Sequence, residues 1–242
     1  MAFLEHEFNL TVRDIDTKTN VTPKALLSFF EDIGGYHSNL VGFGLKDIEK
    51  TKLSWVLLHW KLKILKQIKY TDGPIKIKTW SRGLVRACTF RDFEAYDSKG
   101  NLFAIGSSKW TLIHLEKGLL RITDDIIEKY EIENKSVFEE LDFKKIVTPE
   151  TFSNTYNYTI SRRDIDINNH MHNLNYLDLA YEALPEEIYN NNSFTDIEIM
   201  YKKQGLLGDN ISCLYSFENN EHFITIKNKE NENIIYAVVK LS

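Results

Sequence analysis

The sequence has 242 residues, of which 43% are hydrophobic and 27% are charged, and this balance indicates a packed core and excludes a disordered chain. Its net charge of −5 argues against a general nucleic-acid-binding protein, which needs a basic face to match phosphate. The longest apolar runs are strand-length, and the first residues lack the pattern of a signal peptide, so we expect neither a membrane span nor a leader.

The first half of the chain predicts one long helix followed by antiparallel strands. Residues 22–43 predict the helix, because Thr22 suits an N-cap, Pro23 suits the first helical position, and apolar residues recur at helical spacing. Alternating apolar residues then predict strands over residues 53–65 and 73–83, and a strand–turn–strand hairpin over residues 87–115.

The second half repeats this order of elements. Residues 154–166 predict a strand-like lead-in and residues 173–187 a helix, and four strands follow over residues 194–204, 209–219, 221–229 and 233–242. One helix and a run of antiparallel strands, written twice, predict two copies of an α+β unit in which the helix packs on the sheet. We expect domains over residues 1–120 and 153–242, joined by a linker over residues 121–152 that has room for a short helix.

The stretch RRDIDINNHMHNLNY, residues 162–176, gathers two aspartates, two histidines and four asparagines at the start of the second predicted helix. A histidine such as His170 is the natural general base near neutral pH. The backbone N–H groups that a helix leaves unpaired at its start suit a developing oxyanion. These groups leave a catalytic role open, but asparagine-rich stretches are most often turns and caps, and the composition by itself favours that interpretation.

Two other readings of these residues stay open. Asp164, Asp166, His170 and His172 could bind a metal ion, but the spacing is only weak support for a metal site, and His172 is better explained as a local hydrogen-bonding residue. Cys213 could form a nucleophilic pair with His170, although a cysteine in the middle of a strand is more often a buried structural thiol.

Several words of the sequence, in this order, are similar to those of one known family. The first half contains SWVLLHWKLKI, IKIKTWSRG, RDFEAYDSKGN and SSKWTLIHLEKGLLRI, and the second half contains DIDINNHMHNLNYLDLAYEALP. Over nearly its whole length the chain resembles the acyl-ACP thioesterase family. The resemblance implies an α+β tandem double hotdog, in which each domain is a long helix wrapped by a curved antiparallel β-sheet.

The resemblance also implies a catalytic set. The family's catalytic segment has the form Asp-x-Asn-x-His, which falls here on Asp166, Asn168 and His170. We expect His170 to activate water, Asn168 to orient the water or the substrate, and Asp166 to hold one of them or share the role of base. The family places a Glu, often followed by Cys, on the next strand, where this chain has Gln204 and Gly205. Gln204 could therefore only position a water molecule.

Substrate binding is expected from both halves. Asn173 and Tyr176, at the start of the second helix, are expected to contact the substrate. The first half lacks the Asp-x-Asn-x-His word, so we expect the N-terminal domain to supply the acyl pocket and the C-terminal domain the catalysis. Large aromatic residues of the first half, which are also ordinary core residues, are the candidate pocket walls: Phe29, Phe30, Trp55, Trp80 and Trp110.

The expected activity is hydrolysis of the thioester of fatty acyl-acyl carrier protein, with release of free fatty acid and without a cofactor or metal ion. Gln204 and Gly205 leave open a non-hydrolytic acyl-thioester-binding or sensor protein, and an acyl-CoA thioesterase is a further alternative. Two widely separated cysteines favour a reducing cytoplasm.

Acyl carrier protein is the expected partner, and neither nucleic acid nor a membrane is. A monomer and a homodimer both stay open. The carrier protein is acidic, and local groups of basic residues could steer an anionic partner. These are Lys61, Lys63, Lys66, Lys69, Arg82, Arg86, Arg91, Arg162, Arg163, Lys202 and Lys203.

Overall fold

The computed structural model describes residues 2–85, 87–120, 122–133, 135–139 and 143–242. The chain divides into two compact units, Met1–Phe143 and Lys144–Ser242. Arg86, one of the basic residues considered above, lies outside the described residues. Within these ranges, no helix combines the length and the apolar character that a membrane crossing requires.

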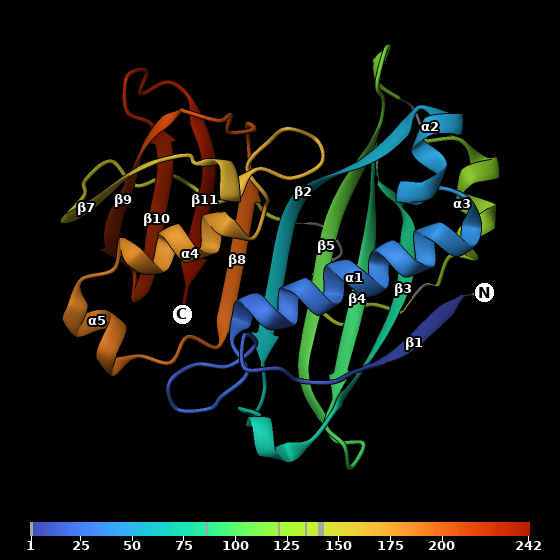
Figure 1. Ribbon diagram of the computed structural model, residues 1–242, viewed down its shortest axis with the longest axis horizontal. Helices are drawn as coiled ribbons and strands as arrows, with labels where there is room; N and C mark the ends of the chain where they lie inside the picture. The colour runs from blue at the N-terminus through green and yellow to red at the C-terminus, as the bar shows by residue number, and fades with distance from the viewer. Residues whose placement is uncertain (1, 86, 121, 134, 140–142) are drawn as a thin grey trace. The chain divides into compact units, whose positions relative to one another are not determined.

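The first unit is an antiparallel sheet with one long helix laid across it. Figure 1 shows helix α1 (Pro23–Val41) crossing one face of this sheet. The strand order is β1–β3–β4–β5–β2, and the strands are β1 (Phe3–Phe8), β2 (Leu53–Ile64), β3 (Ile75–Val85), β4 (Cys88–Tyr96) and β5 (Leu102–His114). The shorter elements are β6 (Gly118–Leu119), α2 (Ile48–Thr51), α3 (Asp124–Tyr130) and 3-10 helices at Leu45–Asp47 and Tyr70–Asp72.

Helix α1 confirms the helix predicted over residues 22–43. The Thr22 side chain accepts the Ala25 N–H at 3.2 Å, and Pro23 occupies the first turn, where its missing N–H has no cost. Gly42 ends the helix with φ 83°, a left-handed conformation that glycine adopts without strain. The face toward the sheet is apolar, and Leu27, Phe30 and Ile33 are fully buried there.

The second unit repeats this plan in a smaller form. Helix α4 (Asn175–Glu182) packs on a sheet of order β8–β11–β10–β9–β7, with strands β7 (Asn154–Thr159), β8 (Asp196–Tyr201), β9 (Asn210–Glu218), β10 (Glu221–Asn228) and β11 (Ile235–Leu241). A 3-10 helix at Arg162–Asp164 follows β7, and α5 (Glu186–Asn191) follows α4.

The structure differs from the sequence-based elements in several places. The lead-in predicted over residues 154–166 is a strand only to Thr159, and a 3-10 helix follows at Arg162–Asp164. The helix predicted over residues 173–187 is interrupted, because Pro185 cannot continue α4 and instead becomes the N-cap of α5. Strand β1 was not predicted, because as an edge strand it buries only Phe8 and shows little alternation. The short helix that the linker has room for is present as α3.

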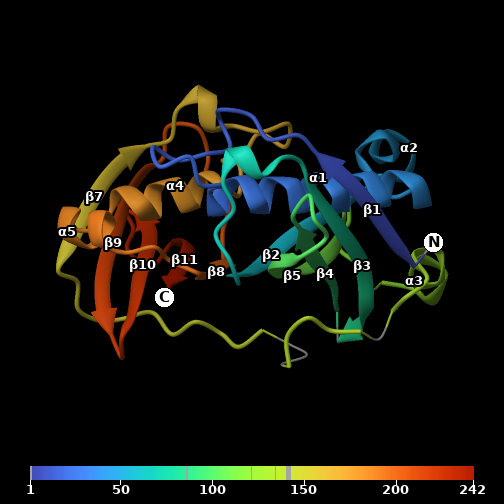
Figure 2. The same ribbon diagram turned by 90° about the horizontal axis from the view of Figure 1, so that it is seen from below.

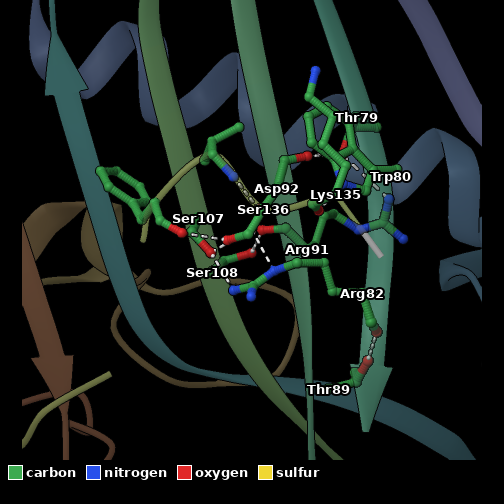
Figure 3. Close-up of polar contacts among 12 residues, drawn as sticks. Thr79, Trp80, Arg82, Thr89, Arg91, Asp92, Ser107, Ser108, Lys135 and Ser136 are labelled. Carbon is green, nitrogen blue, oxygen red and sulfur yellow. Dashed lines mark hydrogen bonds and ion pairs between the residues drawn. The ribbon is translucent and has the colours of Figure 1, made fainter. Parts of the chain in front are cut away.

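The sheet face of the first unit that lies opposite α1 carries a buried ion pair (Figure 3). The Asp92 carboxylate, which is fully buried, accepts a hydrogen bond from Arg82 Nε at 3.0 Å and another from the Ser107 hydroxyl at 2.6 Å. The backbone N–H of Val137 donates to its other oxygen at 2.9 Å. In Figure 2 the segment after α3 passes along this face, so the segment completes the hydrogen bonds of the pair.

A second buried cation lies under α1. The Arg91 guanidinium is 2.9 Å from His37 Nδ1, and donates to the Thr79 and Ser81 hydroxyls at 3.3 and 3.0 Å. Burial lowers the pKa of Arg91 to about 10, which leaves it protonated at neutral pH. A Cβ at Gly34 would lie 3.3 Å from Arg91 Cδ, so the glycine lets α1 lie close over this side chain.

We predict that Asp92→Ala lowers the free energy of unfolding by about 3–5 kcal/mol, because it removes the carboxylate that pairs with the buried Arg82 cation. Urea denaturation followed by circular dichroism measures the change. Replacing both partners, as Arg82→Met with Asp92→Leu, should restore most of the stability, because no buried charge remains.

The exposed pair of Lys76 and Glu5, whose charged atoms lie 3.7 Å apart, is the matched control. Glu5→Ala should change the stability by less than about 1 kcal/mol. An equally small effect of Asp92→Ala would contradict the role given to the buried pair.

Candidate active site

The loop between β7 and α4 is a turn held by the Asp166 carboxylate. Asp166 Oδ1 accepts the backbone N–H of Asn168 at 2.8 Å and that of His170 at 3.3 Å. The Asp166 N–H donates to the His170 carbonyl at 2.8 Å, which closes the turn. Asn169, at the tip, has φ 61°, a conformation that asparagine tolerates better than most residues. Asp166 therefore binds the backbone of His170, and no hydrogen bond joins the Asp166 carboxylate to the His170 imidazole.

A second carboxylate anchors the start of the same loop. Asp164 Oδ2 accepts three hydrogen bonds, from the Ser161 N–H at 2.7 Å and from the Ser161 and Tyr158 hydroxyls at 2.8 Å each. Burial by itself raises the pKa of Asp164, but these bonds and the nearby Arg163 charge outweigh it, and the pKa lies below the ordinary value. Asp164 thus stays ionised at neutral pH and holds the loop.

Asn168, His170 and Gln204, the residues predicted to act on water, lie on two neighbouring segments of the chain. The Met171 N–H donates to the Gly205 carbonyl at 2.9 Å, so the residues that precede them, His170 and Gln204, lie on adjacent segments. Asn168 and Gln204 are exposed, and His170 is half-buried. Among the described residues, none of these three side chains has a hydrogen-bonding partner, so their imidazole and amide groups are available to a ligand.

The predicted substrate-binding residues of this unit have different surroundings. Tyr176 is 2% exposed, and its hydroxyl accepts the Gly205 N–H at 3.0 Å. Asn173 is half-buried, and its carbonyl accepts the Tyr201 hydroxyl at 3.1 Å. His172 Nδ1 accepts the Leu174 N–H at 3.3 Å, which confirms the local role expected for this histidine.

The first unit contains a second copy of the same turn, which the sequence analysis missed. Asp16 Oδ1 accepts the N–H groups of Lys18 and Asn20 at 2.8 and 2.9 Å, and Thr19 at the tip has φ 65°. The Val21 N–H donates to the Ile68 carbonyl at 2.8 Å, as Met171 does to Gly205. The signal for the duplication was the word RDID, which occurs at residues 13–16 and again at 163–166.

The two turns differ in the side chains they present. Lys18 stands in the place of Asn168, and Asn20 in the place of His170. The Asn20 amide donates back to Asp16 Oδ2 at 3.2 Å, whereas the His170 ring makes no such bond within the described part of the loop. Gln67, the copy of Gln204, donates to the Val21 carbonyl at 2.9 Å. The first copy therefore uses these polar groups to hold its own loop.

The predicted pocket aromatics of the first unit do not all lie on the same face of the sheet. Phe30 is fully buried under α1 and stacks on Phe93 with ring centroids 4.6 Å apart. Trp80 points to the opposite face of the sheet, because neighbouring strand residues alternate and both Thr79 and Ser81 face Arg91 under α1. The Trp80 indole donates to the Lys135 carbonyl at 2.8 Å (Figure 3).

The remaining aromatics of this set lie on the α1 side. Phe29 packs on Phe8 with ring centroids 4.8 Å apart. The Trp55 indole donates to the Tyr130 hydroxyl at 3.1 Å, and the Trp110 indole donates to the Ser108 hydroxyl at 2.7 Å.

Among the described residues, neither the Cys213 thiol nor a group of metal ligands provides an alternative catalytic centre. Cys213 is fully buried, and burial raises its pKa to about 12, so at neutral pH it is a thiol and not a nucleophilic thiolate. No three or more His, Cys, Asp or Glu side chains in the described ranges group together as metal ligands would.

The prediction that basic residues steer a partner is wrong for two of them. Arg82 and Arg91 are each 6% exposed and belong to the buried networks of the first unit, so neither can steer a partner. In the second unit, the basic residues Arg162, Arg163, Lys202 and Lys203 are exposed.

Comparison with known proteins matches both units to one family. Residues 2–130 match the model of the acyl-ACP thioesterase N-terminal domain, and residues 147–238 match that of the acyl-ACP thioesterase C-terminal domain. The chain is 23% identical over 87% of its length to oleoyl-acyl carrier protein thioesterase 1 of Arabidopsis thaliana, and 22% identical over 90% of its length to the corresponding protein of Coriandrum sativum. It spans 63% of the length of each of these two relatives.

Solved structures establish the fold. An acyl-ACP thioesterase from Bacteroides thetaiotaomicron superimposes with a TM-score of 0.84 at 22% identity, covering 99% of this chain and 96% of that one. The 12:0-ACP thioesterase from Umbellularia californica gives a TM-score of 0.85 at 16% identity, with the same coverage. The expected α+β double hotdog is thereby confirmed. Since the two family models together match most of its residues, the chain belongs to the acyl-ACP thioesterase family.

Proposed function

We propose that the protein hydrolyses the thioester of fatty acyl-acyl carrier protein and releases free fatty acid. Family membership supports the reaction class, and the names of the relatives support the carrier-bound substrate. The observation that carries the proposal for this chain is the Asp166 turn. It fixes the backbone of Asn168 and His170 through two N–H bonds while their side chains stay available to substrate and water.

In the proposed reaction, His170 takes a proton from water as the water oxygen attacks the thioester carbonyl carbon. The tetrahedral intermediate then collapses, and the carbon–sulfur bond breaks. The sulfur leaves as the thiolate of the carrier's prosthetic group and takes up the proton, and the acyl group leaves as the fatty acid. A thiolate is a good leaving group, so the reaction needs no strong acid.

Amide groups near His170 supply the remaining interactions in this proposal. Asn168 orients the water or the thioester carbonyl, and Gln204 hydrogen-bonds the water as a neutral amide. The backbone N–H of Asn173, for which the described residues provide no acceptor, stabilises the developing oxyanion at the start of α4. Asp166 does not meet the water and acts by holding the turn.

The division of labour between the two units is also a proposal. The C-terminal domain predicted over residues 153–242 carries the reacting groups, and the N-terminal domain predicted over residues 1–120 binds the acyl chain. The apolar surfaces under α1 near Phe29, Phe30, Trp55 and Trp110 support this, since they gather aromatic rings on one side of a sheet. Trp80 faces away from that side and is left out of the proposed acyl pocket.

A non-hydrolytic acyl-thioester-binding protein is the second candidate, because Gln204 lacks the carboxylate that the family has at this position. The purified protein is incubated with acyl-carrier protein or acyl-CoA, and free thiol is measured. Tight binding without thiol release would favour the binding protein over the hydrolase, and faster release from acyl-CoA would favour an acyl-CoA thioesterase.

His170→Ala and Asn168→Ala should each lower kcat by roughly 10²- to 10⁴-fold, since each removes a group that acts on the reacting water. The rate of thiol release from acyl-carrier protein measures this. Asn20→Ala, in the copy of the turn that lacks the imidazole, is the matched control and should leave kcat unchanged. Full activity of both His170→Ala and Asn168→Ala would refute the assignment of the site.

Asp166→Ala and Asp16→Ala should each cost about 0.5–1.5 kcal/mol of stability, because each removes the acceptor of two backbone N–H groups in a turn that water can largely reach. Only Asp166→Ala should reduce kcat, since only its turn holds an imidazole. Chemical denaturation and thiol release measure the two quantities on the same preparations. If Asp16→Ala reduced kcat as strongly as Asp166→Ala, activity would be following stability alone.

The value of kcat/KM for the carrier-bound substrate should fall as salt is added, because exposed Arg162, Arg163, Lys202 and Lys203 attract an acidic carrier only at low ionic strength. A neutral acyl-N-acetylcysteamine thioester should show much less dependence on salt. Lys202→Gln with Lys203→Gln should reduce the salt dependence for the carrier substrate. Equal salt sensitivity of the two substrates would remove the support for steering.

A further inference from the structure

The buried hydroxyl of Tyr176 is bonded to the backbone of the segment that carries Gln204. It accepts the Gly205 N–H at 3.0 Å, and the Tyr176 side chain is 2% exposed. A Cβ on residue 205 would lie 2.8 Å from this hydroxyl and 2.5 Å from Ile160 Cδ1. Glycine at position 205 is therefore required by space, because any side chain would displace the tyrosine or Ile160.

The first unit shows what this pair replaces. The Asp16 turn and the Asp166 turn make corresponding hydrogen bonds between residues that are 150 positions apart in the sequence. The same offset places Leu26 at the position of Tyr176. The bond from Val21 to Ile68 places Ile68 at the position of Gly205. Leu26 and Ile68 are both buried. The second unit thus has a larger helix residue and a smaller loop residue, and the exchange adds a hydroxyl that reaches the loop backbone.

The Gly205 residue is held from two directions. Its N–H donates to the Tyr176 hydroxyl, and its carbonyl accepts the Met171 N–H at 2.9 Å. Gln204 precedes this residue, and His170 precedes Met171. The Gly205 backbone therefore joins α4, the His170 turn and the Gln204 segment. The first unit has the bond from the turn, but its Leu26 offers no hydroxyl from the helix.

We propose that Tyr176 is a positioning residue, which fixes the Gln204 amide relative to His170 through the Gly205 backbone. This inference rests on the proposed function, since it assumes that Gln204 orients the reacting water. Tyr176 does not touch the substrate in this proposal, because its hydroxyl is occupied and its ring is buried. The added hydroxyl replaces part of the rigidity that a strand would give, since β8 ends at Tyr201 and Gln204 lies beyond it.

Tyr176→Phe removes only the hydroxyl and leaves the ring. The Gly205 N–H then lacks its acceptor, and the Gln204 segment is free to shift. We expect kcat to fall roughly 10- to 100-fold with KM nearly unchanged, because misplacement of an orienting group by about 1 Å has an effect of this size.

The experiment measures kcat and KM for Tyr176→Phe, Gln204→Ala and the double variant, with acyl-carrier protein as substrate. If Tyr176 acts through Gln204, the double variant is no slower than Gln204→Ala alone. Multiplying effects in the double variant, or full activity of Gln204→Ala, would overturn the inference. Full activity of Tyr176→Phe would overturn it as well.

Two further variants separate positioning from folding. Tyr215→Phe removes another buried tyrosine hydroxyl of the same unit, which lies 2.9 Å from His222 Nδ1. This matched control should lower the thermal midpoint as Tyr176→Phe does and leave kcat unchanged. Tyr176→Leu gives the helix the residue that the first unit has and keeps Gly205, so it should fold but turn over slowly. Full kcat in Tyr176→Leu would count against the inference.

His170→Ala, measured beside these variants, tests the proposed function on its own. Loss of activity in His170→Ala together with full activity in Tyr176→Phe would leave the hydrolytic site standing and reject only the role of Tyr176. Full activity in His170→Ala would reject the site itself.

Discussion

A carboxylate that accepts two N–H groups of its own turn is the interaction on which the proposed chemistry depends. Asp166 holds the backbone on both sides of Asn169, and so fixes where the side chains of Asn168 and His170 begin. Because the bonds go to backbone atoms, the imidazole is not consumed in holding the loop. One side chain, Asp166, holds the loop, and another, His170, is left to react. A site that must be rigid and still keep its base available needs this division.

The duplication of the turn shows how little backbone change separates a supporting loop from a candidate catalytic one. Asp16 and Asp166 make the same pair of bonds, at 2.8 and 2.9 Å in the first copy and at 2.8 and 3.3 Å in the second. Thr19 and Asn169 share the left-handed tip. In the first copy the polar side chains bond back into the loop, through Asn20 and Gln67. The difference in capability therefore lies in the side chains, since the same turn supports both.

The sequence was informative wherever a local rule fixed the outcome. Thr22 and Pro23 marked the start of α1, and alternating apolar residues marked most strands of both sheets. It was less informative where the outcome depended on distant contacts. Alternation alone does not say which side of β3 faces the helix, so Trp80 was grouped with Phe30. Arg82 and Arg91 read as surface charges because their buried partners come from other strands and from α1.

The segment that follows α3 determines where a stable fragment of the first unit can end. Its described residues contribute the Val137 N–H to Asp92, the Lys135 carbonyl to Trp80, and the Phe143 ring, which stacks on Phe90 with centroids 6.0 Å apart. A recombinant fragment that ended before this segment would open the Arg82–Asp92 pair to solvent and uncover an aromatic surface prone to aggregation. Expression of the first hotdog by itself therefore calls for a terminus beyond Phe143, and a protease that nicks this segment would loosen the sheet beneath it.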